Sequence, residues 1–104
     1  MQRLLLVTPN WIGDALLATP LVQAIKRQQP STSLAVLCVL RVAEIFQHQP
    51  EVDGIFLYEQ QLVRRLRQER FDAAMVLRPS LSRTWLVWAA GIRRRIGHDA
   101  PKSR

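Results

Sequence analysis

Four short apolar runs are spaced along the chain, and amphipathic segments lie between them. The runs cover residues 3–8, 33–40, 55–58 and 72–77. In the first two, aliphatic residues follow one another without alternating with polar ones, which predicts strands buried on both faces. Strands of this kind, separated by helical segments and short connections, indicate an α/β fold with a parallel sheet.

Helices are predicted between these strands. A helical turn is expected over residues 15–18. Pro20 then either interrupts this helix or opens a second one that Thr19 caps, since proline is favoured at a first helical position. In that second helix Lys26 is expected to face the solvent. Further helices are expected over residues 42–47, 60–70 and 83–90, and Gly91 fits the C-terminal cap of the last one.

The alternation of strands and helices predicts a Rossmann-like, doubly wound sheet. Right-handed crossovers and the usual strand order 3-2-1-4 place the first and fourth strands side by side. Residues 93–97 could open a fifth strand. A ligand crevice is then expected where the first and fourth strands end, between residues 8–14 and residues 78–83.

The composition indicates a single globular domain and favours an anionic partner. With 104 residues the chain has room for one domain, and 48% hydrophobic residues argue against disorder. Lys and Arg number 15 against 8 Asp and Glu, a net charge of +7. This balance favours an anionic partner such as a phosphate, nucleic acid or a charged membrane surface, and the plain alternative is a solvated basic face.

Several classes of site are disfavoured by the sequence. Cys38 is the single cysteine, which leaves no internal disulfide, and its apolar run predicts a buried, inert thiol. Neither a G-x-G-x-x-G nor a P-loop motif is present. His48 and His98 are isolated, and acidic residues are never paired at a metal-binding spacing. No apolar run has the roughly 20 residues of a membrane span, and no secretory signal is visible, so a cytoplasmic protein is expected.

The turn after the first strand holds the sharpest chemical candidate. Asp14 is the only carboxylate in the first forty residues. It either stabilises a helix start, by roughly 0.3–1 kcal/mol through the helix dipole, or acts as a general base beside the crevice. Trp11, beside Asn10 and Gly13, is either a lid on the core or an exposed stacking surface.

The facing loop offers a second set of polar side chains. Ser80, Ser82 and Arg83 precede the predicted helix over residues 83–90. Hydroxyl and guanidinium groups at a helix start suit an anion or a polyol. The alternative is that Ser80 or Ser82 only caps this helix.

The motif Asn10-Trp11-Ile12-Gly13-Asp14, followed by Ala18-Thr19-Pro20, resembles the N-terminal motif of ADP-heptose:lipopolysaccharide heptosyltransferases, glycosyltransferase family 9. The residues of this motif are more similar to those of the second heptosyltransferase branch than to those of the first. Further blocks of that family resemble Pro50-Glu51-Val52-Asp53, Phe71-Asp72 and Arg94-Arg95-Ile96-Gly97. The resemblance extends along the chain to about His98.

This resemblance implies a GT-B glycosyltransferase, in which two Rossmann-like domains enclose the active site and transfer inverts the anomeric centre without a metal or cofactor. Residues 1–98 would be an incomplete acceptor-side N-terminal domain and residues 99–104 a polar tail, with the donor-binding C-terminal domain absent. Asp14 would be the catalytic base. The substrate-binding residues would be Asn10, Trp11, Gly13, Ser80, Ser82 and Arg83.

The partners implied are the lipopolysaccharide inner core as acceptor and ADP-heptose, bound through the missing C-terminal domain. Peripheral contact with the inner face of the inner membrane is expected, and nucleic acid is not. The chain alone is expected to be inactive. Two alternatives stay open: a non-catalytic basic Rossmann-like module that binds nucleotide or nucleic acid, and a truncated remnant that folds poorly.

Overall fold

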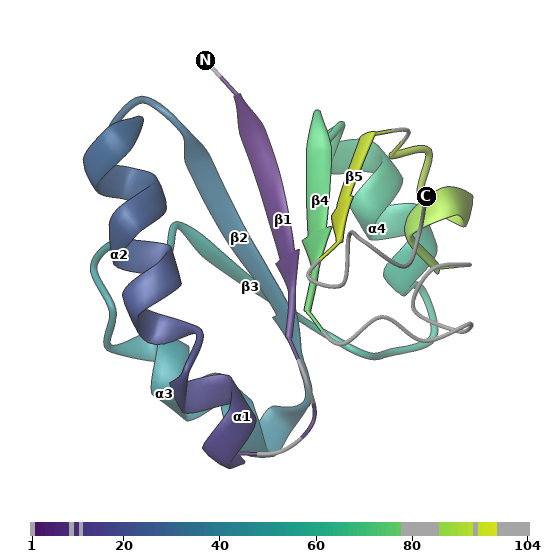
Figure 1. Ribbon diagram of the computed structural model, residues 1–104. Coiled ribbons are helices and arrows are strands. Elements are labelled where there is room, and N and C mark those ends of the chain that lie inside the picture. Colours follow the sequence, from purple (N-terminus) through teal and green to yellow (C-terminus); the bar gives the residue numbers. More distant parts are fainter. Residues whose placement is uncertain (1, 9, 11, 78–85, 93, 98–104) are drawn as a thin grey trace.

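The computed structural model describes residues 2–8, 10, 12–77, 86–92 and 94–97. Five parallel strands form one sheet in the order β3-β2-β1-β4-β5 (Figure 1). The strands are β1 (Arg3–Val7), β2 (Ser33–Cys38), β3 (Gly54–Leu57), β4 (Ala73–Val76) and β5 (Arg94–Gly97). The predicted order of the first four strands, and the fifth strand, are confirmed.

Helices cover both faces of this sheet. The helices are α1 (Ile12–Leu16), α2 (Thr19–Gln28), α3 (Leu40–Gln47) and α4 (Leu62–Glu69), and residues 86–89 are also helical. The first three lie on one face, and α4 lies on the other with residues 86–89 (Figure 1). The sheet is therefore doubly wound, as the sequence predicted.

Successive residues of β1 belong to two different hydrophobic clusters. Leu4 and Leu6 pack with the buried residues of α1, α2 and α3. Leu5 and Val7 pack with α4 and with residues 86–92. Each fully buried aliphatic side chain contributes roughly 1.5–3 kcal/mol to stability, so a central strand without polar alternation suits this fold.

The start of α3 corrects one boundary. The second apolar run was predicted to be a strand as far as Leu40, but β2 ends at Cys38 and Leu40 begins α3 with 73% of its surface exposed. Val39 is the extended N-cap residue between them. An apolar run alone does not mark where a strand gives way to a helix, because both conformations can bury aliphatic residues.

The connection between α1 and α2 also differs from expectation. The first helix begins at Ile12 and ends at Leu16, before the predicted turn of residues 15–18 is complete. Pro20 lies in the first turn of α2, as predicted, but Thr19 does not cap this helix. Its hydroxyl instead donates to the Leu16 carbonyl oxygen at 2.9 Å. That carbonyl is the acceptor that the missing N–H of Pro20 would have used in a continuous helix, which explains the break.

The last described helical segment ends as predicted. Gly91 has a φ of +82°, which glycine adopts without steric cost. The Gly91 N–H donates to the Trp88 carbonyl at 3.0 Å, and the Ile92 N–H donates to the Val87 carbonyl at 3.3 Å. These two bonds form a Schellman motif, and buried Val87 and Ile92 supply its hydrophobic contact.

Candidate functional site

The carboxyl ends of β1 and β4 lie side by side and send the chain to opposite faces of the sheet. Val7 pairs with Val76, and the Leu77 N–H donates to the Val7 carbonyl at 3.0 Å. From β1 the chain continues to α1 on one face, whereas the helical residues after β4 lie on the other (Figure 1). This divergence is the switch point at which ligands bind in open α/β sheets.

Thr8 directly follows β1, and its buried side chain is not available to a ligand. Its side chain is fully buried, and its N–H donates to the Leu37 carbonyl at 3.1 Å. The Thr8 hydroxyl donates to the same carbonyl at 3.4 Å. The residue therefore extends the hydrogen bonding of β1 beyond Val7 and fixes where the following turn leaves the sheet.

The structure brings three of the seven predicted site residues together at this edge. Asn10 is exposed in the turn after β1, and Gly13 and Asp14 lie in α1, which follows that turn. The predicted site residues Trp11, Ser80, Ser82 and Arg83 lie outside the described residues. The position of Asp14 within the first turn of a five-residue helix is compatible with both interpretations of its carboxylate.

Gly13 has no structural need to be a glycine. Its φ is not positive, and a Cβ atom built on it would meet no atom of the described chain within 4 Å. Glycine costs roughly 0.5–1 kcal/mol relative to alanine inside a helix. Within the described part of the chain, neither the backbone nor the packing requires a glycine at this position.

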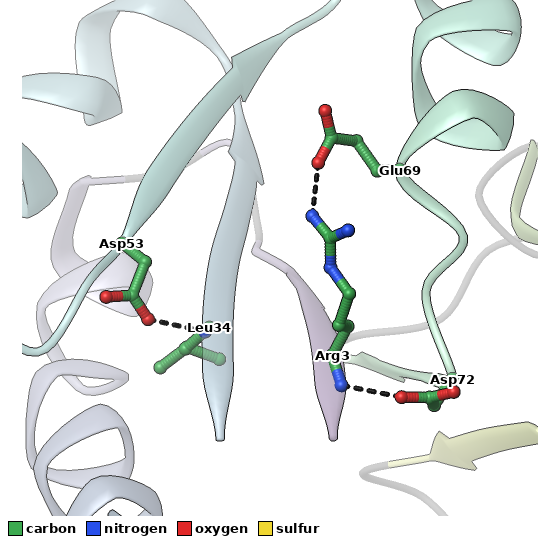
Figure 2. A network of polar contacts seen from close by, with 5 residues as sticks. All are labelled: Arg3, Leu34, Asp53, Glu69 and Asp72. Carbon is green, nitrogen blue, oxygen red and sulfur yellow. Dashed lines mark hydrogen bonds and ion pairs between the residues drawn. The ribbon is translucent and has the colours of Figure 1, made fainter. Parts of the chain in front are cut away.

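The opposite edge of the sheet holds two aspartates that the sequence interpretation had counted only as family blocks. Asp72 directly precedes β4, where its carboxylate accepts a 2.7 Å hydrogen bond from the Arg3 N–H and its own N–H donates to the Arg3 carbonyl at 2.8 Å (Figure 2). Asp53 directly precedes β3 and forms the same pair of bonds with Leu34, at 2.8 and 2.7 Å. We call these two arrangements the aspartate clamps.

The aspartate clamps satisfy N–H groups at the starts of β1 and β2 that the parallel ladder leaves unpaired. A signal for them exists in the sequence, because Val52-Asp53-Gly54-Ile55 and Phe71-Asp72-Ala73-Ala74 share the pattern apolar, Asp, small, apolar. They lie at the edge away from the switch point, so these two motif residues stabilise the sheet and do not contact a ligand bound there.

Two ion pairs reinforce the same edge. Arg3 pairs with Glu69, the last residue of α4 (Figure 2). The Arg3 guanidinium also lies 5.7 Å from the centre of the Phe71 ring. Lys26 Nζ lies 2.8 Å from Asp53 Oδ2. The prediction that Lys26 faces the solvent is therefore wrong, because its side chain reaches from α2 to the start of β3 and is only 19% exposed.

Among the described residues, Asp53 and Cys38 have shifted pKa values. Partial burial acts to raise the pKa of Asp53, but hydrogen bonds from Lys26 and from the Leu34 N–H, with the charge of Lys26, outweigh it and lower the pKa. Burial raises the pKa of the Cys38 thiol to about 11. The thiol is therefore protonated at neutral pH, which fits the inert core cysteine predicted from its apolar run.

Neither a metal centre nor a membrane span is present in the described part of the chain. There, no three His, Cys, Asp or Glu residues are grouped closely enough to hold a metal ion. Among the same residues, no helix has the length and apolarity needed to cross a bilayer.

Similarity to known proteins points to one enzyme class. The chain is 26% identical over 106 aligned residues to lipooligosaccharide heptosyltransferase 2 of Haemophilus ducreyi, an alignment that covers 92% of this chain and 30% of the relative. The solved structure of E. coli ADP-heptose LPS heptosyltransferase II matches 93% of the chain at 27% identity with a TM-score of 0.82. The resemblance to heptosyltransferases is confirmed.

Two further solved structures share the fold. A family 9 glycosyl transferase from Veillonella parvula matches with a TM-score of 0.84 at 14% identity, and E. coli heptosyltransferase WaaC, solved with ADP, matches with 0.84 at 17%. They cover 98% and 99% of this chain. No protein-family model matches. The chain spans about 30% of the length of the two heptosyltransferases to which it is more than 25% identical.

Proposed function

We propose that residues 1–98 form the acceptor-side, N-terminal part of an inverting glycosyltransferase that transfers heptose from ADP-heptose to the lipopolysaccharide inner core. The observation that carries the proposal is the similarity to two heptosyltransferases, each over more than nine-tenths of the chain. The location of the Asn10–Asp14 motif at the switch point of the sheet supports it, because that is where an open α/β sheet binds its ligand.

In the proposed reaction Asp14 is the general base. A hydroxyl oxygen of the acceptor attacks the anomeric carbon of heptose, and its proton passes to the Asp14 carboxylate. The bond between that carbon and the phosphate oxygen breaks at the same time, so ADP leaves with the electron pair and the configuration inverts. A positioned base of this kind typically contributes about 10²–10⁴-fold to the rate.

The remaining site residues bind the acceptor in this proposal. Asn10 and Trp11 contribute a polar and an aromatic surface from the turn after β1. Gly13 leaves space for the approaching sugar, in keeping with the open surroundings of its Cβ position. Ser80, Ser82 and Arg83, which follow β4 in the sequence, bind the hydroxyl and phosphate groups of the acceptor in this proposal.

ADP-heptose binds to a second, donor-binding domain in the proposed enzyme. Because the chain spans about 30% of the two heptosyltransferases, we expect the 104 residues alone to transfer no heptose. We further propose that the protein works in the cytoplasm at the inner face of the inner membrane. Its basic residues there meet anionic lipid, and no nucleic acid takes part.

The test replaces the base in a complete enzyme. In full-length E. coli heptosyltransferase II, the residue that aligns with Asp14 is changed to asparagine, and turnover is measured with ADP-heptose and inner-core acceptor. We expect kcat to fall by about 10²-fold or more, because the amide cannot accept the proton. The control changes the residue that aligns with Asp72 to asparagine, which should leave kcat near normal. Near-normal turnover of the first variant would remove Asp14 from the catalytic role.

The acceptor side is tested on this chain directly. Binding of inner-core oligosaccharide is measured for the 104-residue protein and for its Asn10→Ala and Asp14→Asn variants. We expect both substitutions to weaken binding. Oligosaccharide binding that neither substitution changes would contradict the assignment of this edge as the acceptor site.

A further inference from the structure

A break separates α1 from α2, although the burial pattern would allow one continuous helix. Three residues of this part of the chain are buried in the same cluster, Ala15, Ala18 and Val22. Ile25 is partly buried against that cluster. Spacings of three, four and three residues would place these side chains on one face of a single helix over residues 12–28. Burial therefore does not require the break.

Two polar features of the backbone and one side chain cause the break. Pro20 has no N–H, so it cannot donate to the Leu16 carbonyl as a residue of a continuous helix would. The Thr19 hydroxyl donates to this carbonyl at 2.9 Å and takes the place of the missing donor. The Ala18 N–H donates to the Ala15 carbonyl at 2.9 Å, which tightens the last turn of α1. We call Thr19 and Pro20 the α1–α2 joint.

The helix on the near side of this joint carries part of the candidate site. Gly13 and Asp14 both lie in α1. The helix is held by buried Ala15 and Ala18 and is in contact with α3. Figure 1 shows α1 at the carboxyl edge of the sheet, from which α2 runs back toward the amino edge. A change in the direction of α1 relative to α2 would therefore move Asp14 relative to the switch point.

We propose that Thr19 is a positioning residue for Asp14, and that Pro20 permits this role by removing the competing N–H. The inference rests on the proposed function for the role of Asp14, whereas the joint itself is formed by described residues. The break lets α2 pack along the sheet while α1 keeps a direction of its own at the switch point. A misplacement of about 1 Å can cost a reaction about 10²-fold in rate, so this direction matters to a catalytic group.

The first experiment measures whether the joint sets the direction of α1. Residual dipolar couplings of backbone N–H groups give the angle between α1 and α2 in the unchanged chain and in Thr19→Val/Pro20→Ala. This variant removes the hydroxyl and restores an N–H at position 20, and Ala18 already has right-handed helical dihedral angles. We expect the two helices to align and the restored N–H to be protected from hydrogen exchange, because alanine continues a helix and proline does not. An unchanged angle would overturn the proposal.

The matched control makes the same two chemical changes at the other end of α2. Thr32→Val/Pro30→Ala alters the connection to β2, where the Thr32 hydroxyl donates to Gln29 Oε1 at 3.2 Å. This connection precedes Ser33, the first residue of β2, and so lies at the amino edge. We expect the control to change stability without changing the angle of α1, and to change acceptor binding by less than about 2-fold, since it is remote from the switch point.

The second experiment measures whether the joint acts through Asp14. We expect Thr19→Val/Pro20→Ala to weaken binding of inner-core oligosaccharide about 5–10-fold. In an Asp14→Asn background the same change should weaken binding by less than about 2-fold, because residues that act as a unit are not additive. Equal losses in the two backgrounds would mean that the joint does not act through Asp14 and would overturn the proposal.

Single substitutions at Thr19 give a milder test that leaves Pro20 in place. Thr19→Ser keeps the hydroxyl and should bind oligosaccharide as the unchanged chain does. Thr19→Val keeps the branched shape and loses the hydroxyl, so it should bind more weakly. Equal binding by the serine and valine variants would contradict the role given to the hydroxyl.

Failure of the proposed function and failure of the joint give different results. No oligosaccharide binding by the unchanged chain would contradict the acceptor site and, with it, the role of Asp14 on which this proposal rests. Full binding by a variant whose helices have aligned would leave the proposed function in place and refute the positioning role of Thr19. A loss of binding that the Thr32→Val/Pro30→Ala control reproduces would also refute that role.

Discussion

At the amino edge of the sheet, Asp53 and Asp72 each close a pair of hydrogen bonds with a neighbouring strand, and Lys26 and Arg3 complete the network (Figure 2). At the carboxyl edge, the motif after β1 includes Gly13, whose Cβ position meets no atom of the described residues. Both edges carry residues that resemble family motifs. The comparison shows that hydrogen bonds within the sheet explain the first set, whereas the described structure gives the glycine of the second set no such explanation.

The largest effect on stability is expected at the amino edge. Replacing Asp72 by alanine removes the carboxylate that accepts from the Arg3 N–H and leaves that donor unpaired in the chain. We expect the free energy of unfolding to fall by about 1–2 kcal/mol, since a hydrogen bond to a charged group is lost at an exposed position. Thermal denaturation should show a fall of roughly 4–8 °C for each kcal/mol in a domain of this size.

The control for this substitution is Glu59→Ala, which removes only the exposed pair with Arg65. An exposed ion pair contributes about 0–1 kcal/mol, so its melting temperature should change less. Equal losses in the two variants would show that Asp72 contributes as a surface charge and that the clamp adds nothing.

A smaller effect of opposite sign is expected at the carboxyl edge. Gly13→Ala should stabilise the chain by roughly 0.5–1 kcal/mol, because alanine is the better helix former and its methyl group meets open space. Acceptor binding by the same variant should become weaker, because the methyl group occupies the space left for the sugar. Chemical denaturation and an oligosaccharide titration measure the two effects.

Loss of stability in Gly13→Ala would mean that the glycine has a packing role, and the contrast between the two edges would weaken. Gly54→Ala is a matched comparison. A Cβ atom there also meets nothing within 4 Å, but the residue lies in β3 and not beside the switch point, so acceptor binding should not change.

The smallest effect concerns the acid side of the stability curve. The pKa of Asp53 is lower in the folded chain than the value of about 3.9 expected in the unfolded chain, so its carboxylate stabilises the fold above about pH 4. This contribution is lost as the pH falls through the lower, folded value. Asp53→Asn should therefore cost less than about 1 kcal/mol at neutral pH, given the 45% exposure of this side chain.

The measurement for Asp53 is the free energy of unfolding between pH 4 and pH 2. The asparagine variant should lose less stability than the unchanged chain over this range, because it has no proton to bind at that position. A Glu59→Gln variant serves as the comparison for an exposed carboxylate. Identical pH dependence of Asp53→Asn and the unchanged chain would contradict the role given to Asp53.

Most of the sheet could be predicted because buried strands appear in the sequence as short runs of consecutive apolar residues. The continuous aliphatics of β1 and β2 predicted strands covered on both faces. Right-handed crossovers and the usual doubly wound order then predicted the order of the first four strands. Gly91 was predicted to cap the last helix because the residue after a helix often adopts a left-handed conformation, which favours glycine. At the candidate site the same rules placed the turn after β1 beside the end of β4.

Two features that depend on which partner a polar side chain meets were missed. The Thr19 hydroxyl was expected to cap α2. It instead donates to the Leu16 carbonyl, an acceptor that Pro20 leaves unpaired because it has no N–H. The side chain of Lys26 was expected in solvent, but β3 brings Asp53 within reach. Local periodicity cannot show either outcome, because it describes which face a residue occupies and not what lies opposite.

By itself, the sequence determined the strands, their parallel order and the turn after β1 that holds Asn10, because these follow from local burial patterns and chirality. Only the tertiary structure decided which of the charged side chains are paired. It joined Arg3 to Asp72 across 69 positions and Leu34 to Asp53 across 19, and it left Arg64, Arg67 and Arg70 without a counter-ion among the described residues. The physical reason is that charge pairing depends on distance in space, which this chain sets by folding remote segments onto neighbouring strands.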